Sequence, residues 1–372
     1  MNVSVIGGGI FGITAALKMR ARGHEVTIFE PGPIPHPLAE STDISKVVRM
    51  DYGADEDYTD LGERSLRGWR VWNSVWRKPL FHETGVTFLS RTSMRPGGFE
   101  HDSYATLTAR GHELERLDAD QIATRFPAYR RGALVDGYFN RAGGWAESGA
   151  VVEYLSRVAS GAGIAIEQRA IHDLAEVRRD LTIVCAGAWV PRLVPELAGS
   201  IRAIGQPVFH LRPRDPALYT ADRFPVFGAD IANTGYYGFP VNADGIVKIA
   251  NHGSGTPIER DEERVVSEAH EVALRAFLAT TLPGLRDAPI AHRRLCVYAD
   301  TLDGHFWIAR HPTDESLVVA TGGSGHAFKF APVLGALIAG IILDGEHPLE
   351  DKFRWRPELG AQTRGDAARA DR

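Results

Sequence analysis

The sequence predicts an α/β protein, in which a parallel sheet with crossover helices is joined to a second domain built on a mostly antiparallel sheet. Apolar stretches at 1–6, 181–189 and 317–330 each end in small residues, and the first and last run into helical patterns. Residues 80–145 and 206–298 alternate apolar with polar residues and are rich in turn residues. Strands that lead into helices favour a parallel sheet, whereas short alternating strands favour an antiparallel one.

The first 30 residues have the pattern of a complete strand–helix–strand unit. Residues 3–6 form a short apolar strand, residues 10–19 have helical periodicity, and Gly23 ends that helix. Residues 25–30, EVTIFE, then form a second strand with β-branched residues. A unit of this length is typical of a nucleotide-binding fold.

Three glycines connect the first strand to the helix. Gly7, Gly9 and Gly12 form a G-x-G-x-x-G motif. In this motif the first glycine permits a tight turn, the second lets the backbone approach a pyrophosphate, and the third lets the helix pack on the strand. The amides of Ile10 and Phe11, at the start of the helix, would face the phosphates. The motif therefore predicts a dinucleotide site.

The identity of the dinucleotide depends on the end of the second strand. Glu30 stands there and is placed to accept hydrogen bonds from a ribose hydroxyl. A carboxylate at this position disfavours NADP, because it would repel the additional phosphate. NAD and FAD carry the same adenosine diphosphate, so the motif does not separate them.

The glycine-bearing strand ends are spread from the first tenth of the chain to the last, which predicts a nucleotide domain assembled from separate segments. The expected nucleotide-binding segments are 1–79, 146–205 and 299–372. Residues 80–145 and 206–298 are expected to form the substrate domain, with a helix inserted at 260–281. The apolar run 331–343 predicts a buried helix, and residues 356–372 predict a frayed tail.

Composition restricts the partners and the location. The net charge of −5, without a long basic run, disfavours nucleic-acid binding. No signal-peptide pattern precedes the first strand, and the longest apolar run is too short to span a bilayer, so we expect a soluble protein without a membrane partner. Cys185 and Cys296 lie in unlike contexts, which favours free thiols and a cytoplasmic location. The sequence has no HExxH or CxxC motif, and we expect no metal.

Five further blocks, in order along the chain, resemble one family of flavoproteins. They are STDISKVVRMDYG (41–53), YYGFP (236–240), VKIANH (247–252), RRLCVYADTLDGHFWI (293–308) and GGSGHAFKF (322–330). Together with the glycine motif they resemble the monomeric sarcosine oxidase and N-methyltryptophan oxidase family, within the D-amino acid oxidase-like superfamily. Fructosyl amine oxidases form a related branch that shares much of the pattern.

The resemblance implies FAD in a Rossmann-like domain of the GR2 type. In this family a cysteine that matches Cys296 carries the flavin through an 8α thioether, whereas a lone cysteine is otherwise more often a buried structural residue. Cys185, inside an apolar strand, keeps that structural interpretation. The remaining residues expected at the cofactor lie in the same blocks: Ser45, Lys46, Gly323, Gly325 and Lys329.

The resemblance also implies roles for basic residues. Lys248 matches the lysine that activates O2, although its alternating strand is equally typical of an exposed lysine. His252, four residues later, is expected on the same face and beside the substrate. Arg49 and Lys329 would hold a substrate carboxylate. Lys46 replaces the arginine that sarcosine oxidases place over the flavin, which keeps the charge but loses planar stacking.

Aromatic residues complete the expected site. Tyr237 and Tyr298 match walls of the substrate pocket, with ordinary aromatic packing as the alternative. His305 is expected to contact the flavin or to be structural. The segments around 50–60 and 205–245, which would close the pocket, have the least family-like sequence.

The resulting prediction is an FAD-dependent amine oxidoreductase. It would oxidise a secondary amine, an N-methyl or cyclic amino acid, to an imine that water hydrolyses, while O2 is reduced to hydrogen peroxide. One alternative substrate is a fructosyl amino acid, and one alternative activity is a dehydrogenase that uses another electron acceptor. The alternative to an enzyme is a flavoprotein whose FAD is structural and whose surface serves assembly. The family is often monomeric, so we expect a monomer.

Overall fold

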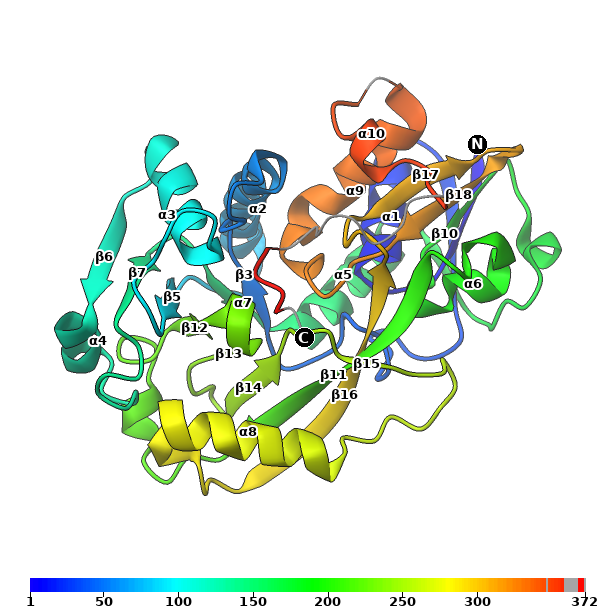
Figure 1. Ribbon diagram of the computed structural model, residues 1–372. Coiled ribbons are helices and arrows are strands. Elements are labelled where there is room, and N and C mark those ends of the chain that lie inside the picture. Colours follow the sequence, from blue (N-terminus) through cyan, green and yellow to red (C-terminus); the bar gives the residue numbers. More distant parts are fainter. Residues whose placement is uncertain (346, 358–366, 371–372) are drawn as a thin grey trace.

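The structure, a computed structural model, describes residues 1–345, 347–357 and 367–370. Its strands belong to two large sheets on opposite sides of the molecule and a small third sheet (Figure 1). Residues 358–366 and 371–372, part of the tail predicted to fray, lie outside the described residues. Among the residues that are described, no helix has both the length and the hydropathy needed to cross a membrane.

The first sheet is the predicted parallel one. Its strand order is β17 (Trp307–His311), β18 (Asp314–Thr321), β10 (Leu181–Val184), β1 (Asn2–Ile6), β2 (Glu25–Glu30) and β9 (Ala165–Gln168). All neighbours are parallel except β17, which pairs antiparallel with β18. The three strands predicted to end in small residues, β1, β10 and β18, are therefore neighbours in one sheet.

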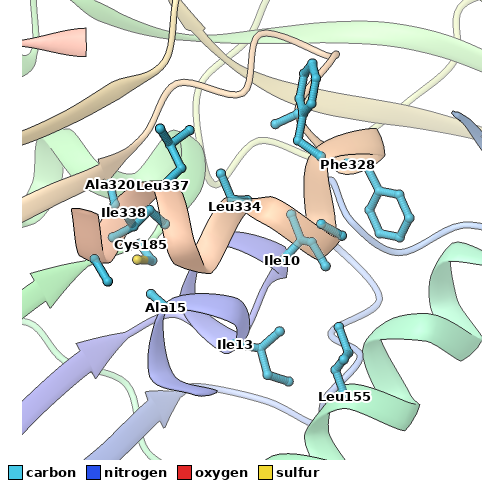
Figure 2. Close-up of a cluster of buried hydrophobic side chains, with 14 of the residues drawn as sticks. Ile10, Ile13, Ala15, Leu155, Cys185, Ala320, Phe328, Leu334, Leu337 and Ile338 are labelled. Carbon is cyan, nitrogen blue, oxygen red and sulfur yellow. The ribbon is translucent and has the colours of Figure 1, made fainter. Parts of the chain in front are cut away.

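Three helices build the apolar core beside this sheet. Helix α1 (Ile10–Ala21) packs against α9 (Ala331–Ala339) and α5 (Ser148–Gly161). Figure 2 shows side chains of α1, α5 and α9 converging, and the core positions of α1 and α9 are fully or almost fully buried. The predicted buried helix 331–343 is thus confirmed, and its last turn, Gly340–Asp344, is a π-helix.

Gly12 sets how closely α1 approaches the first strand. A Cβ added at this position would lie 1.9 Å from the carbonyl oxygen of Gly7, and backbone cannot move aside as a side chain can. We expect Gly12→Ala to lower the free energy of unfolding by about 1–3 kcal/mol and to reduce the cofactor content of the purified protein. Gly161→Ala in α5 is the control, because a Cβ there meets no atom within 4 Å. Equal urea midpoints and equal cofactor content for the two variants would contradict this expectation.

The second sheet has nine strands and is mostly antiparallel. Its order is β15 (Thr256–Pro257), β11 (Ile201–Leu211), β14 (Val247–Asn251), β13 (Tyr236–Gly238), β12 (Val226–Ala229), β5 (Val86–Ser90), β7 (Asp136–Asn140) and β6 (Leu114–Asp118), with β16 (Ile290–Thr301) paired to β11. Only β5 and β12 pair in parallel. This arrangement confirms the predicted fold class. The long strands β11 and β16 run across the predicted domain boundaries at 205/206 and 298/299.

The third sheet, β3 (Lys46–Val48), β8 (Gly144–Ala146) and β4 (Phe81–His82), connects the two halves and carries Lys46. Helix α2 (Glu56–Val75) begins at Asp55, whose side chain accepts a hydrogen bond from the Tyr58 amide. The remaining helices are α3 (Phe99–Ala109), α4 (Ala119–Arg125), α6 (Val190–Leu193), α7 (Ile231–Thr234), α8 (Glu268–Thr281) and α10 (Glu350–Phe353).

Two local predictions need correction. The helix predicted over 260–281 begins only at Glu268, because Ser267 and His270 form a capping box that starts it there. The tail is not frayed at 367–370. Ala368 and Ala370 are buried, and the Ala370 amide donates to the His252 carbonyl at 3.0 Å.

Candidate active site

A cavity of about 360 Å³ lies along the carboxyl ends of β1, β2, β10 and β18. Ligands of open parallel sheets bind at this edge. Eight of the residues predicted at the cofactor line the cavity: Gly7, Gly9, Ile10, Phe11, Glu30, Lys46, Gly323 and Gly325. The cavity is therefore the candidate dinucleotide site.

The glycines of this cavity are needed for its shape. Gly7 has a φ of +107°, and a Cβ there would lie 2.5 Å from the Cys185 carbonyl oxygen. Gly325 has a φ of +79°, and its Cβ would lie 2.1 Å from the Tyr298 ring. Gly9 also lines the cavity, and a Cβ there would lie 3.3 Å from Oγ of Ser41 on the same wall. The bare backbone thus leaves room for a pyrophosphate, as a dinucleotide requires.

Glu30 is the last residue of β2 and lines the cavity. Its carboxylate accepts a hydrogen bond from the Gly8 amide at 2.6 Å. Burial raises the pKa of Glu30, while the Gly8 amide and the charge of His36 act in the opposite direction. The Glu30 carboxylate therefore binds the backbone of the glycine turn and also forms part of the cavity wall.

Four of the residues predicted at the cofactor do not line this cavity. Gly12 is buried within α1, Ser45 and Lys329 line the neighbouring cavities described below, and Cys296 lies on β16. The Cys296 thiol is buried, 3.8 Å from Nζ of Lys46. Burial lowers the pKa of Lys46, but Cys296, Asp43, Tyr237 and Glu40 outweigh burial, so the net shift is upward.

A second cavity, of about 50 Å³, adjoins the first. Lys46, Gly325 and Phe328 line both. Four predicted substrate residues lie on its wall: Arg49, Tyr237, His252 and Lys329. Apolar side chains of β5, β12 and α7 also line it: Val86, Phe88, Val226, Phe227 and Ile231. Val47, Thr87 and His326 are the other residues of its wall. Tyr298 is not part of this wall and packs behind His252, with ring centroids 5.8 Å apart.

Lys46, Arg49 and Lys329 all line this cavity. Arg49 and Lys329, 280 residues apart in the chain, meet at Tyr52. The guanidinium of Arg49 lies 4.5 Å from the Tyr52 ring centroid, and Nζ of Lys329 donates to the Tyr52 hydroxyl at 2.8 Å. Both cations are about 5% exposed. The backbone carbonyl of Lys329 accepts hydrogen bonds from Ser65 and Trp69, which anchors it to α2. Two positive charges are thus held, buried, next to each other on the cavity wall.

Asp51 lies fully buried behind Arg49. Its carboxylate accepts a hydrogen bond from the Tyr138 hydroxyl at 2.8 Å and lies 3.4 Å from Nδ2 of Asn140. Burial raises the pKa of Asp51, while the charge of Arg49 counteracts that shift. Asp51 and Tyr52 stand inside the quoted block 41–53, yet sequence reasoning assigned them no role. Their pattern, MDYG, does not reveal which side chains turn inward.

Lys248 lies at a third, small cavity of about 10 Å³ and not at the one that His252 lines. Lys248 and His252 were expected on one face of a strand, but they line different cavities. The reason is that β14 ends at Asn251, so His252 lies beyond the strand. Lys248 is 1% exposed, which rules out the exposed-lysine alternative. Its Nζ lies 2.7 Å from the Asp43 carboxylate and donates to the Ser45 carbonyl at 2.5 Å. Burial lowers the pKa of Lys248 to about 8.

His305 contacts Tyr58 of α2 and lines none of the three cavities. Its ring stacks on Tyr58 at 5.7 Å between centroids, and Nδ1 lies 3.3 Å from the Tyr58 hydroxyl. Of the two roles expected for His305, these contacts support the structural one.

A parallel sheet with a glycine-turn cavity, adjoined by a cation-lined pocket, is the arrangement expected of a dinucleotide-dependent enzyme. The profile of the family described as FAD dependent oxidoreductase matches residues 2–341, so the chain belongs to this family. The protein is an FAD-dependent oxidoreductase, as the sequence predicted.

Comparisons with single proteins agree with this assignment. The chain is 30% identical to an N-methyl-L-tryptophan oxidase of Salmonella heidelberg, over 95% of this chain and 98% of that protein. The fold is similar to that of the fructosamine oxidase Amadoriase II of Aspergillus fumigatus, with a TM-score of 0.84, 24% identity, and coverage of 100% and 93% of the two chains. A modified fructosyl peptide oxidase of Aspergillus nidulans gives a TM-score of 0.82 at 22% identity, covering 99% and 97%. These similarities confirm the predicted family and fold class.

Proposed function

We propose that this protein oxidises the secondary amine of an N-substituted amino acid and reduces O2 to hydrogen peroxide. The observation that carries the proposal is the meeting of the two larger cavities at Lys46, Gly325 and Phe328, with the buried cations Arg49 and Lys329 in the smaller one. The names of the similar proteins refer to N-methyl-L-tryptophan and to fructosamines, and both are secondary amines. A carboxylate-bearing amine beside a flavin fits this arrangement.

The residues that would hold FAD are those of the large cavity. The amides at the start of α1 would bind the pyrophosphate and Glu30 the ribose. Cys296 would form the thioether, next to Lys46. When bound, FAD supplies the two-electron acceptor for the C–H bond beside the nitrogen and returns the electrons to O2.

The chain's own side chains would bind and orient the amine. Arg49 and Lys329 would hold the substrate carboxylate, which places the amine toward Lys46. His252 and Tyr237 would form the opposite wall, with Tyr298 packed behind them. The apolar wall of β5 and β12 would receive the N-substituent or side chain.

Lys248 would serve the reaction with oxygen. Reduction of O2 first creates negative charge on oxygen, and a cation held away from water stabilises that charge more strongly than an exposed one. The burial of Lys248 and its pairing with Asp43 support this role.

Measurement of hydrogen peroxide per amine consumed tests the proposal. N-methyl-L-tryptophan, other N-methyl amino acids, cyclic imino acids and fructosyl amino acids are each supplied to the yellow protein. One peroxide per amine supports an oxidase, and the best substrate class identifies the pocket. Turnover of a fructosyl amino acid alone would favour the second candidate, which the fold of the Aspergillus enzymes suggests. Turnover only with an artificial electron acceptor would replace the oxidase by a dehydrogenase.

The covalent flavin link has its own test. In acid-precipitated wild type we expect the yellow colour to stay in the pellet, and Cys296→Ala should release all of it, because only a covalent bond survives unfolding. Cys185→Ala is the matched control, since Cys185 is also buried and lines the cofactor cavity, yet should keep the flavin in the pellet. Release of flavin from the wild type would overturn the thioether.

Two expectations about the protein in the cell remain predictions. Cys185 and Cys296 are both buried and form no disulfide, which supports the predicted cytoplasmic, reducing location. The monomeric state, expected from the family resemblance, is checked by light scattering of the purified protein.

A further inference from the structure

The carboxylate of Asp43, to which sequence reasoning gave no role, is the ion-pair partner of Lys248. One carboxylate oxygen lies 2.7 Å from Nζ of Lys248, and the other lies 3.2 Å from Nε2 of His210. The side chains of Asp43 and Lys248 are each 1% exposed. Asp43 therefore joins a buried lysine and a buried histidine away from water.

The fold brings these three side chains together from two directions. His210 on β11 and Lys248 on β14 are direct partners in the antiparallel register, so their side chains lie next to each other on one face. Asp43 approaches from the opposite side. Its backbone carbonyl accepts hydrogen bonds from the Gly149 amide and the Ser148 hydroxyl, both at 2.9 Å, at the start of α5. The backbone of Asp43 is thus fixed to the start of α5, while its carboxylate contacts His210 and Lys248 of the second sheet.

The charge of Asp43 also affects the protonation of Lys248. A buried ammonium without an anionic partner gives up its proton, because burial disfavours the charged form. Burial lowers the pKa of Lys248 to about 8, and the charge of Asp43 opposes a larger fall. The other titratable groups that face the pair lie on β3, β11, β13 and β16: Lys46, His210, Tyr237, His292, Arg294 and Cys296. The positive charge of Lys46 lowers the pKa of Lys248, and the negative charge of Asp43 acts in the opposite direction.

We infer that Asp43 is a positioning residue for the reaction with oxygen, which keeps Lys248 protonated and holds its Nζ in place. His210 orients the carboxylate from the other side. The inference rests on the oxygen role proposed for Lys248. It adds a residue, Asp43, that touches neither the substrate cavity nor the cofactor cavity.

The first experiment measures the pH profile of reoxidation. Reduced holoenzyme is mixed with O2 at a series of pH values, and flavin absorbance is followed in wild type and in Asp43→Asn, which removes the charge at nearly constant shape. We expect the pH midpoint to move down by about one unit or more, because the ammonium loses its nearby negative charge. Asp136→Asn is the control, since Asp136 pairs with Arg116 on the far strands β6 and β7. An unmoved midpoint in a folded Asp43→Asn protein would overturn the inference.

The second experiment does not depend on turnover. Urea unfolding midpoints of the holoenzyme are compared for Asp43→Asn, Lys248→Met and the double variant. Each single substitution leaves a buried polar partner without its counter-charge, so we expect the double variant to lose clearly less than the sum of the two losses. Additive losses would overturn the pairing. If Lys248→Met leaves reoxidation unchanged while the losses are non-additive, the oxygen role fails and the pair remains structural.

Discussion

Lys248→Met is expected to slow reoxidation of the reduced protein by O2 by roughly 10²–10³-fold, the cost of removing one preorganised charge from a buried site. Reduction of the protein by amine should change little, because Lys248 does not line the substrate cavity. Stopped-flow absorbance, with the two half-reactions measured separately, checks both parts.

The pH dependence of the same step follows from the lysine. Its pKa of about 8 lies below the ordinary value of 10.5, so the ammonium is present below pH 8 and is lost as the pH rises through about 8. Reoxidation of the wild type should therefore fall in that range, and Lys248→Met should lack this fall. Lys352→Met, which removes a lysine paired with Asp55 and Asp57 outside the cavities, is the control and should keep the wild-type profile. A methionine variant as fast as wild type would disprove the oxygen role.

Arg49→Met is expected to lower kcat/KM for a carboxylate-bearing amine by roughly 10²–10³-fold, since losing one partner of a buried charge pair costs about 2–5 kcal/mol. The reason is the position of Arg49 on the cavity wall, next to Tyr52 and Lys329. Arg49→Lys should recover part of the loss, because it restores the charge without the planar fork. Steady-state peroxide assays over a range of amine concentrations measure the effect.

An amine without the carboxylate makes this test specific. The decarboxylated analogue has nothing for Arg49 to bind, so wild type and Arg49→Met should oxidise it at similar rates. Arg116→Met controls for loss of a guanidinium in the second sheet, because Arg116 pairs with Asp136 away from the cavities. If acid and analogue lose activity equally in Arg49→Met, the residue supports the fold and does not hold a carboxylate.

Local patterns predicted much of the fold. The strand at 2–6, the helix from Ile10 and the strand at 25–30 lie where the sequence put them, because glycine turns, helical periodicity and β-branched runs act over a few residues. Gly7 and Glu30 line the candidate dinucleotide cavity, because they stand at the ends of these two locally determined strands. The start of α8 was wrong by eight residues, since polar residues continue the helical pattern ahead of the Ser267 cap.

The sequence by itself determined the glycine turn, the two kinds of sheet and, through its family resemblance, which cations to examine. Only the tertiary structure decided which of them meet. The contact of Lys329 with Tyr52 and that of Lys248 with Asp43 each join residues more than 200 positions apart in the sequence. No local pattern encodes such a pair, because its geometry depends on sheet register and on helices that hold each backbone in place. The burial that lowers the pKa of Lys248 arises in the same way, from neighbours that meet only after folding.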